Sequence, residues 1–276
     1  MKGLWNKGWW VAAFIVAGAA FAMAAPTRMP RPGLLNSVQG HVTLNAHPAA
    51  QTPMRWRALR AGHVVATRHG KASLLLTPGS FLRIGNNSAV RMLSRSLENT
   101  RVWVVKGMAI VDVQAGYKHD LAIIMDRTTT RINKNGIYGF NANAKTISVL
   151  HGKATVYQGD SRIRLNHKRQ LYIASRGDLQ LHKLNKRAFK SSSLYQWNKA
   201  RNRYEARARR SVQQRIAQTG RWFGPGWYWS HYWGFYAYVP SAGAYLAPYY
   251  GPNYGAWGWN DWDWGGGWGW GDGDGD

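Results

Sequence analysis

The sequence predicts an all-β body, followed by one long basic helix and a disordered tail. Between Leu59 and Val156, short runs rich in Val, Ile, Leu and Thr are broken by Gly or Pro-Gly, the pattern of strands and tight turns. No run there is long or helically periodic enough for a core helix. From Ser193 to Thr219, apolar residues recur at helical spacing among many Lys and Arg. We expect a signal peptide at 1–24, a linker at 25–33, a β domain at 34–184, a helix at 187–220 and a low-complexity tail at 221–276.

The N-terminal segment has the pattern of a secretory signal peptide. Lys2 and Lys7 precede an apolar run from Trp9 to Met23. Small residues suited to cleavage stand at the end of this run, at Ala22, Ala24 and Ala25. The run is a little short of the roughly 20 apolar residues that a membrane span needs. We therefore expect a periplasmic or secreted protein, with an inner-membrane anchor formed by residues 9–25 as the alternative.

The chain contains no Cys. A lipoprotein anchor, which requires a Cys, is therefore excluded, and so are thiol nucleophiles and Cys-ligated zinc. An exported protein without disulfides must hold itself together with its hydrophobic core.

The β body is expected to form a two-layer sandwich or a solenoid-like roll of short strands. Leu34 to Leu44 alternates loosely around Gly40, as a first strand pair would. The run Leu74–Leu76 is too apolar for a half-exposed strand, so we place it between two β layers. Val102, Val104, Ile110 and Val113 are expected to share the core, with Trp103 or Val105 on the opposite pleat. Weaker strands follow at 162–165, 170–173 and 179–184.

Four Gly-centred motifs in this body resemble the FecR-type periplasmic domain. They are Leu59 to Thr67 around Gly62, Pro78 to Ile84 around Gly79, Val102 to Val113 around Gly107, and Ile147 to Val156 around Gly152. Gly at such positions supplies the positive φ that short turns require. The resemblance extends from about Leu35 to Val156 and implies an extracytoplasmic all-β module that binds or packs against another molecule.

The chain departs from the FecR pattern in two places. Family members carry Gly-Thr-x-Phe near the end of the domain, whereas here only a Gly and Phe140 match within Asn135–Phe140. The best-known members are membrane sensors of iron-siderophore uptake with a cytoplasmic anti-sigma domain before the span. Only Met1 to Gly8 precede the apolar run here, so we do not expect the sigma-factor function.

The predicted helix is amphipathic and basic. Ser193 and Gln196 fit a capping box, and Gly220 fits a C-terminal cap. The apolar stripe consists of Leu194, Trp197, Tyr204, Ala208, Val212 and Ile216. The basic residues on the other faces, which are the candidate polyanion-binding site, are Lys199, Arg201, Arg203, Arg207, Arg209, Arg210 and Arg215. Either the stripe docks on the β body with the charges solvated, or the basic face binds an anionic surface.

The tail from Trp222 onward is rich in Trp, Tyr and Gly and has little aliphatic periodicity, so it is not expected to fold alone. Its rings can pack back on the Arg-rich helix, associate with other copies or a protein partner, or stack on sugars.

Charge separates the body from the tail. The net charge is +25, every Lys and Arg lies at or before Arg221, and only Asp residues are charged after it. A basic body favours polyanionic partners. In an exported protein these are a membrane surface or an acidic envelope polymer, and we expect no nucleic acid.

We expect no enzyme activity and no cofactor. Glu98 and Glu205 are the only glutamates, and the Asp residues of the body show no paired spacing for acid–base catalysis. The sequence contains no Gly-x-Ser-x-Gly or His-Glu-x-x-His motif, and no metal site is expected. The function that these observations favour is binding or scaffolding at the cell envelope. The alternative is a membrane-anchored FecR-like regulator without the anti-sigma domain.

Overall fold

The structure is a computed structural model that describes residues 32–49, 59–77, 79–96, 98–114, 120–132, 134–175, 177–219, 226–230 and 235–239. Side chains are described up to residue 207. The predicted signal peptide with its cleavage residues Ala22, Ala24 and Ala25, nearly all of the linker, and most of the tail lie outside these residues.

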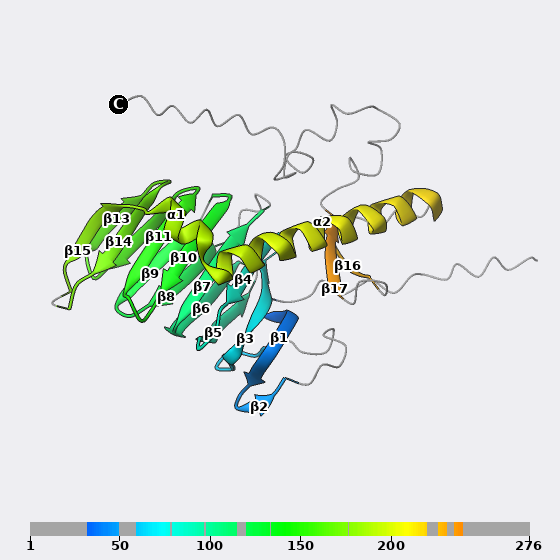
Figure 1. Cartoon of the computed structure of the whole chain (residues 1–276), viewed down its shortest axis with the longest axis horizontal. Helices are drawn as coiled ribbons and strands as arrows, with labels where there is room; N and C mark the ends of the chain where they lie inside the picture. The colour runs from blue at the N-terminus through cyan, green and yellow to red at the C-terminus, as the bar shows by residue number, and fades with distance from the viewer. Residues whose placement is uncertain are drawn as a thin grey trace, which may run out of the picture.

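The all-β prediction is confirmed for the body, which is built from short strands (Figure 1). The first are β1 Leu34–Leu44, β2 His47–Pro48, β3 Val64–Thr77, β4 Ser80–Ile84, β5 Ala89–Ser96, β6 Asn99–Lys106, β7 Met108–Val113 and β8 Asp120–Met125. They continue with β9 Thr128–Ile132, β10 Gly136–Asn141, β11 Thr146–His151, β12 Ala154–Gln158, β13 Ser161–Leu165, β14 Arg169–Ile173 and β15 Leu179–Lys183. The weaker strands expected after residue 160 therefore form as β13, β14 and β15.

These strands form one curled sheet in the order β13-β12-β9-β8-β6-β5-β3-β4-β7-β10-β11-β14-β15. Strand β1 pairs with β3 and with β2. Strand β3 connects the two halves of the sheet, because its residues 64–66 pair with β5 and its residues 72–77 pair with β4. β6 and β8 run parallel, whereas the other pairs along this order are antiparallel. Contacts between β13 and β14 show that the sheet curls round on itself.

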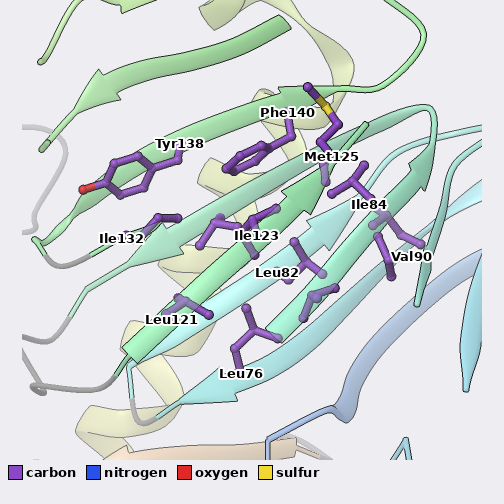
Figure 2. Packing of buried hydrophobic residues seen from close by; sticks show 14 of the residues in the cluster. Leu76, Leu82, Ile84, Val90, Leu121, Ile123, Met125, Ile132, Tyr138 and Phe140 are labelled. Carbon is purple, nitrogen blue, oxygen red and sulfur yellow. The ribbon is translucent and has the colours of Figure 1, made fainter. Parts of the chain in front are cut away.

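The curl encloses the main hydrophobic core. Leu76 and Leu82 on one half of the sheet lie near Leu121 and Ile123 on the other (Figure 2). Leu74 and Leu76 are buried in this core, as the sequence predicts. The other residues that line the inside, with exposures of 8% or less, include Ile84, Val90, Val102, Val104, Val113, Met125, Ile132, Tyr138 and Phe140.

Ile110 differs from its prediction. It was expected in the main core, but it belongs to a second cluster on the outer face of the sheet, with Ile137, Leu150, Leu184, Leu194 and Tyr195. The reason is the pleat, since alternate residues of β7 point to opposite faces and Ala109, Val111 and Val113 take the inner positions. Trp103 is half-buried and Val105 is exposed, on the pleat opposite Val102 and Val104, as predicted.

Two helices lie along this outer face, α1 Lys186–Ser191 and α2 Ser193–Thr219 (Figure 1). The single helix expected from residue 187 is therefore interrupted at Ser192, whose backbone is extended at φ −60° and ψ 138°. The predicted cap is displaced by one residue, because Ser192 Oγ accepts from the Tyr195 backbone amide at 3.3 Å. The Gln196 side chain donates instead to the Lys190 carbonyl oxygen at 2.6 Å.

The first part of the tail contains an antiparallel hairpin, β16 Gly226–Ser230 and β17 Phe235–Val239. The sequence predicts a tail without regular structure, whereas these residues form two strands. Runs such as Trp227-Tyr-Trp229 and Phe235-Tyr-Ala-Tyr-Val239 have high β propensity. The hairpin also contacts α2 and β1, and such contacts stabilise a two-stranded hairpin that would be marginal alone.

The four motif glycines all adopt positive φ, at 87° for Gly62, 73° for Gly79, 76° for Gly107 and 93° for Gly152. Gly107 is also sterically confined. A Cβ added there would lie 2.3 Å from Ser88 Oγ and 2.5 Å from the Asn87 carbonyl oxygen, whereas one added at Gly62 would meet nothing within 4 Å.

We predict that Gly107→Ala lowers the free energy of unfolding by about 3 kcal/mol, because the strain of positive φ adds to a clash with backbone. Gly62→Ala, the matched control, should cost only about 1 kcal/mol, from the positive φ alone. Urea denaturation of the two variants measures the difference. Equal losses of unfolding free energy in the two variants would contradict the close packing of Gly107 against Asn87 and Ser88.

Candidate functional site

The one cluster of charged side chains that is buried in the described part of the chain lies between α2 and the sheet. Arg83 on β4 and Asp112 on β7 are both completely buried. Arg83 is opposite Ile110 and Asp112 is opposite Phe81, so the two charged residues are diagonal neighbours on the outer face. They face the side of α2 that packs on the sheet.

The helix contributes Asn198, Asn202 and Glu205, whose exposures are 1%, 7% and 7%. Their spacing of four and three residues places them on one side of an α-helix. We name Arg83, Asp112, Asn198, Asn202 and Glu205 the docking cluster.

Arg83 is the centre of the docking cluster. Its Nη2 donates to Glu205 Oε2 at 2.8 Å, and its Nη1 lies 3.4 Å from Asp112 Oδ2. Nη1 also donates to Asn198 Oδ1. The guanidinium carbon lies 4.8 Å from the centre of the Phe81 ring. One cation therefore joins a strand neighbour to two residues of the helix.

Other polar groups of the cluster bind one another or residues close to the strand ends, whereas Arg83 Nε and Asp112 Oδ1 are buried without a hydrogen-bond partner among the described residues. Asp112 Oδ2 accepts from Asn198 Nδ2 and from Asn202 Nδ2, both at 2.7 Å. Asn36 Nδ2 on β1 donates to Glu205 Oε1 at 3.1 Å, and Gln114 Nε2 donates to Asn202 Oδ1 at 2.9 Å. Hydrogen bonds of this kind are what make a buried charge tolerable.

Arg201 extends the cluster along the helix. Its Nη2 lies 3.6 Å from Glu205 Oε1, its side chain is 17% exposed, and its guanidinium lies 4.8 Å from the Tyr204 ring. Burial lowers the pKa of Arg201, and the charge of Glu205 opposes that shift. Two arginines thus balance two carboxylates. Burial, with a smaller contribution from Asp112, raises the pKa of the neighbouring Tyr195 to about 12.

The structure separates the basic residues that the sequence singled out. Arg201 turns toward the sheet and Lys199 is half-buried, whereas Arg203 and Arg207 are exposed. Arg209, Arg210 and Arg215 belong to α2, but their side chains lie outside the described part. Of the predicted basic residues whose side chains are described, Arg203 and Arg207 are therefore exposed, and Arg201 contacts the docking cluster.

Docking of the apolar stripe on the β body, one of the two interpretations of the sequence, is seen at the start of α2, where the side chains are described. Leu194 is buried, and Trp197 and Tyr204 are half-buried. Ala208, Val212 and Ile216 lie beyond the described side chains. From Asn198 to Glu205 the helix packs through polar groups, offset from the apolar stripe.

Sequence reasoning missed Arg83, Asp112 and Glu205 as partners. Each of the two strands carries a charge within an apolar run, in Phe81-Leu-Arg-Ile84 and in Ala109-Ile-Val-Asp-Val113. A charge in a strand that is buried on both faces needs a partner of opposite sign. That signal predicts that Arg83 and Asp112 are paired, although it does not identify Glu205 as the third member.

Two further observations concern the described residues. They contain no group of three or more His, Asp or Glu side chains placed to hold a metal ion. Among the helices of that part, none combines the length and the hydropathy needed to cross a membrane.

Comparison with known proteins gives little similarity. No family model matches the chain, and no curated protein matches it. Two crystal structures of a candidate anti-sigma factor from Parabacteroides distasonis ATCC 8503, at 2.50 Å and 1.65 Å resolution, are similar at 16% and 15% identity, each with a TM-score of 0.39. In both cases the match covers 44% of this chain and 59% of the length of the other.

We predict that Glu205→Gln lowers the free energy of unfolding by about 3 kcal/mol, because it leaves the charge of the buried Arg83 only partly compensated. The matched control is Glu98→Gln, which changes the chain's other glutamate at an exposed position and should have almost no effect. Thermal and urea denaturation measure both. If both variants lost equally little free energy of unfolding, the docking of α2 would not depend on the docking cluster.

Proposed function

We propose that this protein is a non-enzymatic binding or scaffolding protein of the cell envelope that acts outside the cytoplasm and has a FecR-type β domain as its body. The signal-peptide pattern at residues 1–24 supports export. The FecR resemblance is supported by the positive φ at Gly62, Gly79, Gly107 and Gly152, the four glycines on which its motifs depend.

The docking of α2 is the observation that carries this proposal. The helix has 27 residues and is therefore about 40 Å long, from 1.5 Å per residue. Its first half is held on the sheet by the docking cluster, and the second half continues past the sheet beside β16 and β17 (Figure 1). Arg203 and Arg207 face solvent on this fixed element. A rigid basic arm on a basic body suits contact with an anionic surface.

We propose a role without catalysis because the buried carboxylates already pair with Arg83. Asp112 and Glu205 both bind Arg83 beneath α2, and neither is open to a substrate. Their arrangement serves to hold the helix, since an acid–base pair needs access to the reacting atoms.

Intact mass distinguishes this proposal from a membrane-anchored regulator. We predict that the exported protein has lost the first 24 residues, because small residues at Ala22 and Ala24 suit cleavage. Mass spectrometry of the envelope fraction measures this. A full-length mass in the inner membrane would favour the anchored regulator instead.

We predict that replacing Arg203, Arg207 and Arg210 by Gln weakens sedimentation of the protein with anionic vesicles or cell-wall fragments. Each basic residue near an anionic surface contributes roughly 1 kcal/mol, and added salt should screen the interaction. Gln retains helix propensity, so the fold should survive.

The charge-matched control replaces three exposed arginines of the body, Arg60, Arg68 and Arg169, by Gln. It should sediment as the wild type does. Equal binding by the helix variant and the wild type, at all salt concentrations, would show that α2 is only a structural brace.

A further inference from the structure

A second basic surface lies on the half of the sheet that α1 and α2 do not cover. Strand register places residues of β5, β6, β8, β9, β12 and β13 in two adjacent rows. One row is Arg91, Trp103, Ile124, Thr129, Tyr157 and Arg162. The other row is Ser94, Arg101, Ala122, Arg131, Thr155 and Arg164.

Both rows face outward. Their neighbours along each strand, such as Val102, Ile123 and Val156, belong to the inner core, and the pleat turns the rows the other way. Arg91, Arg131, Arg162 and Arg164 are exposed, and Arg101 is half-buried. We name the five arginines, with Trp103 and Tyr157, the arginine face.

Three of these arginines lie over aromatic rings. The guanidinium of Arg91 lies 5.7 Å from the centre of the Trp103 ring. Those of Arg131 and Arg162 lie 5.6 Å and 5.8 Å from the Tyr157 ring. Arg101 Nε donates to Asn99 Oδ1 at 2.7 Å. Guanidinium forks that are already ordered lose less conformational entropy when they bind.

The two rows contain no acidic residue, so no member of either row neutralises the arginines. Six strands separated by five steps of about 4.8 Å give the face a width of about 24 Å. The shape is therefore a long cationic strip on the outside of the curled sheet, which fits an extended chain that carries anionic groups at intervals.

We propose that the arginine face binds an acidic polysaccharide, whose carboxylate groups pair with the guanidinium forks. This assignment rests on the proposed envelope function, and it adds a ligand class and a site that is separate from α2. Arg binds planar carboxylates through two parallel hydrogen bonds, and repeated carboxylates along a sugar chain match repeated forks along the rows.

The surroundings of the arginines disfavour two other polyanions, an anionic membrane and single-stranded nucleic acid. Membrane binding uses a broad protruding apolar face, whereas here Trp103 and Ile124 are half-buried among arginines and polar residues. Single-stranded nucleic acid binding uses free aromatic faces for base stacking, whereas Trp103 and Tyr157 already stack on arginines.

The test measures binding of galacturonate oligomers of increasing length to the whole exported protein by calorimetry. Affinity should rise with length until an oligomer spans the face, and neutral galactose oligomers of equal length should not bind. Replacing Arg131, Arg162 and Arg164 by Gln should lower the affinity at least about tenfold, because charge-assisted hydrogen bonds are lost. Tyr157→Leu, which keeps the net charge, should also weaken binding by releasing Arg131 and Arg162.

Two controls separate this proposal from the function of α2. The variant with Arg60, Arg68 and Arg169 changed to Gln has the same net charge as the arginine-face variant and should bind as the wild type does. The variant with Arg203, Arg207 and Arg210 changed should also retain galacturonate binding. Circular dichroism confirms that each variant is folded.

Three results would overturn the proposal. The first is equal loss of binding in the arginine-face and charge-matched variants, which would indicate only diffuse attraction. The second is tighter binding of single-stranded DNA than of galacturonate at the same salt concentration. The third is binding to anionic vesicles alone. Failure of the vesicle experiment on α2 would leave this test unaffected, because it concerns different residues.

Discussion

The buried contact of Arg83 with Asp112 and Glu205 fixes the position of α2 on the sheet. Removing charges from water is costly, so the cluster is favourable only when every partner is in place. Asn198 and Asn202 complete it from the same side of the helix. A slip of one residue would rotate this side by about 100° and separate all of the pairs. The neighbouring apolar contacts provide attraction, and the polar cluster selects one register.

Successive side chains of β4 and β7 point to opposite faces of the sheet, so these strands contribute both to the core and to the outer face. Leu82 and Ile84 line the enclosed core, while Phe81 and Arg83 present the outer platform on which the helix lies. On the other side of β3, the half of the sheet from β5 to β13 has an outer face of its own, which carries the arginines. One continuous sheet therefore presents two outer faces of different character, one covered by helices and one lined by exposed arginines.

Much of the body could be predicted from the sequence because strand patterns and turn glycines are local. Gly107 needs positive φ whatever surrounds it, and Leu76 is apolar enough to require burial. The partners of α2 could not be predicted in the same way. The side of α2 that docks is polar, and its Glu205 binds Arg83, which lies 122 residues away along the chain. The face to which Ile110 points depends on strand register, and the hairpin β16–β17 depends on contacts with α2 and β1.

The place of β13 in the strand order has a consequence for solubility. Among the described strands it pairs only with β12, so its other side is an open edge. Open edges can recruit strands from other molecules, and charged side chains are a common protection. Arg162 and Arg164 give this edge like charges that repel a second copy. Two arginines of the arginine face thereby also protect this edge against edge-to-edge assembly.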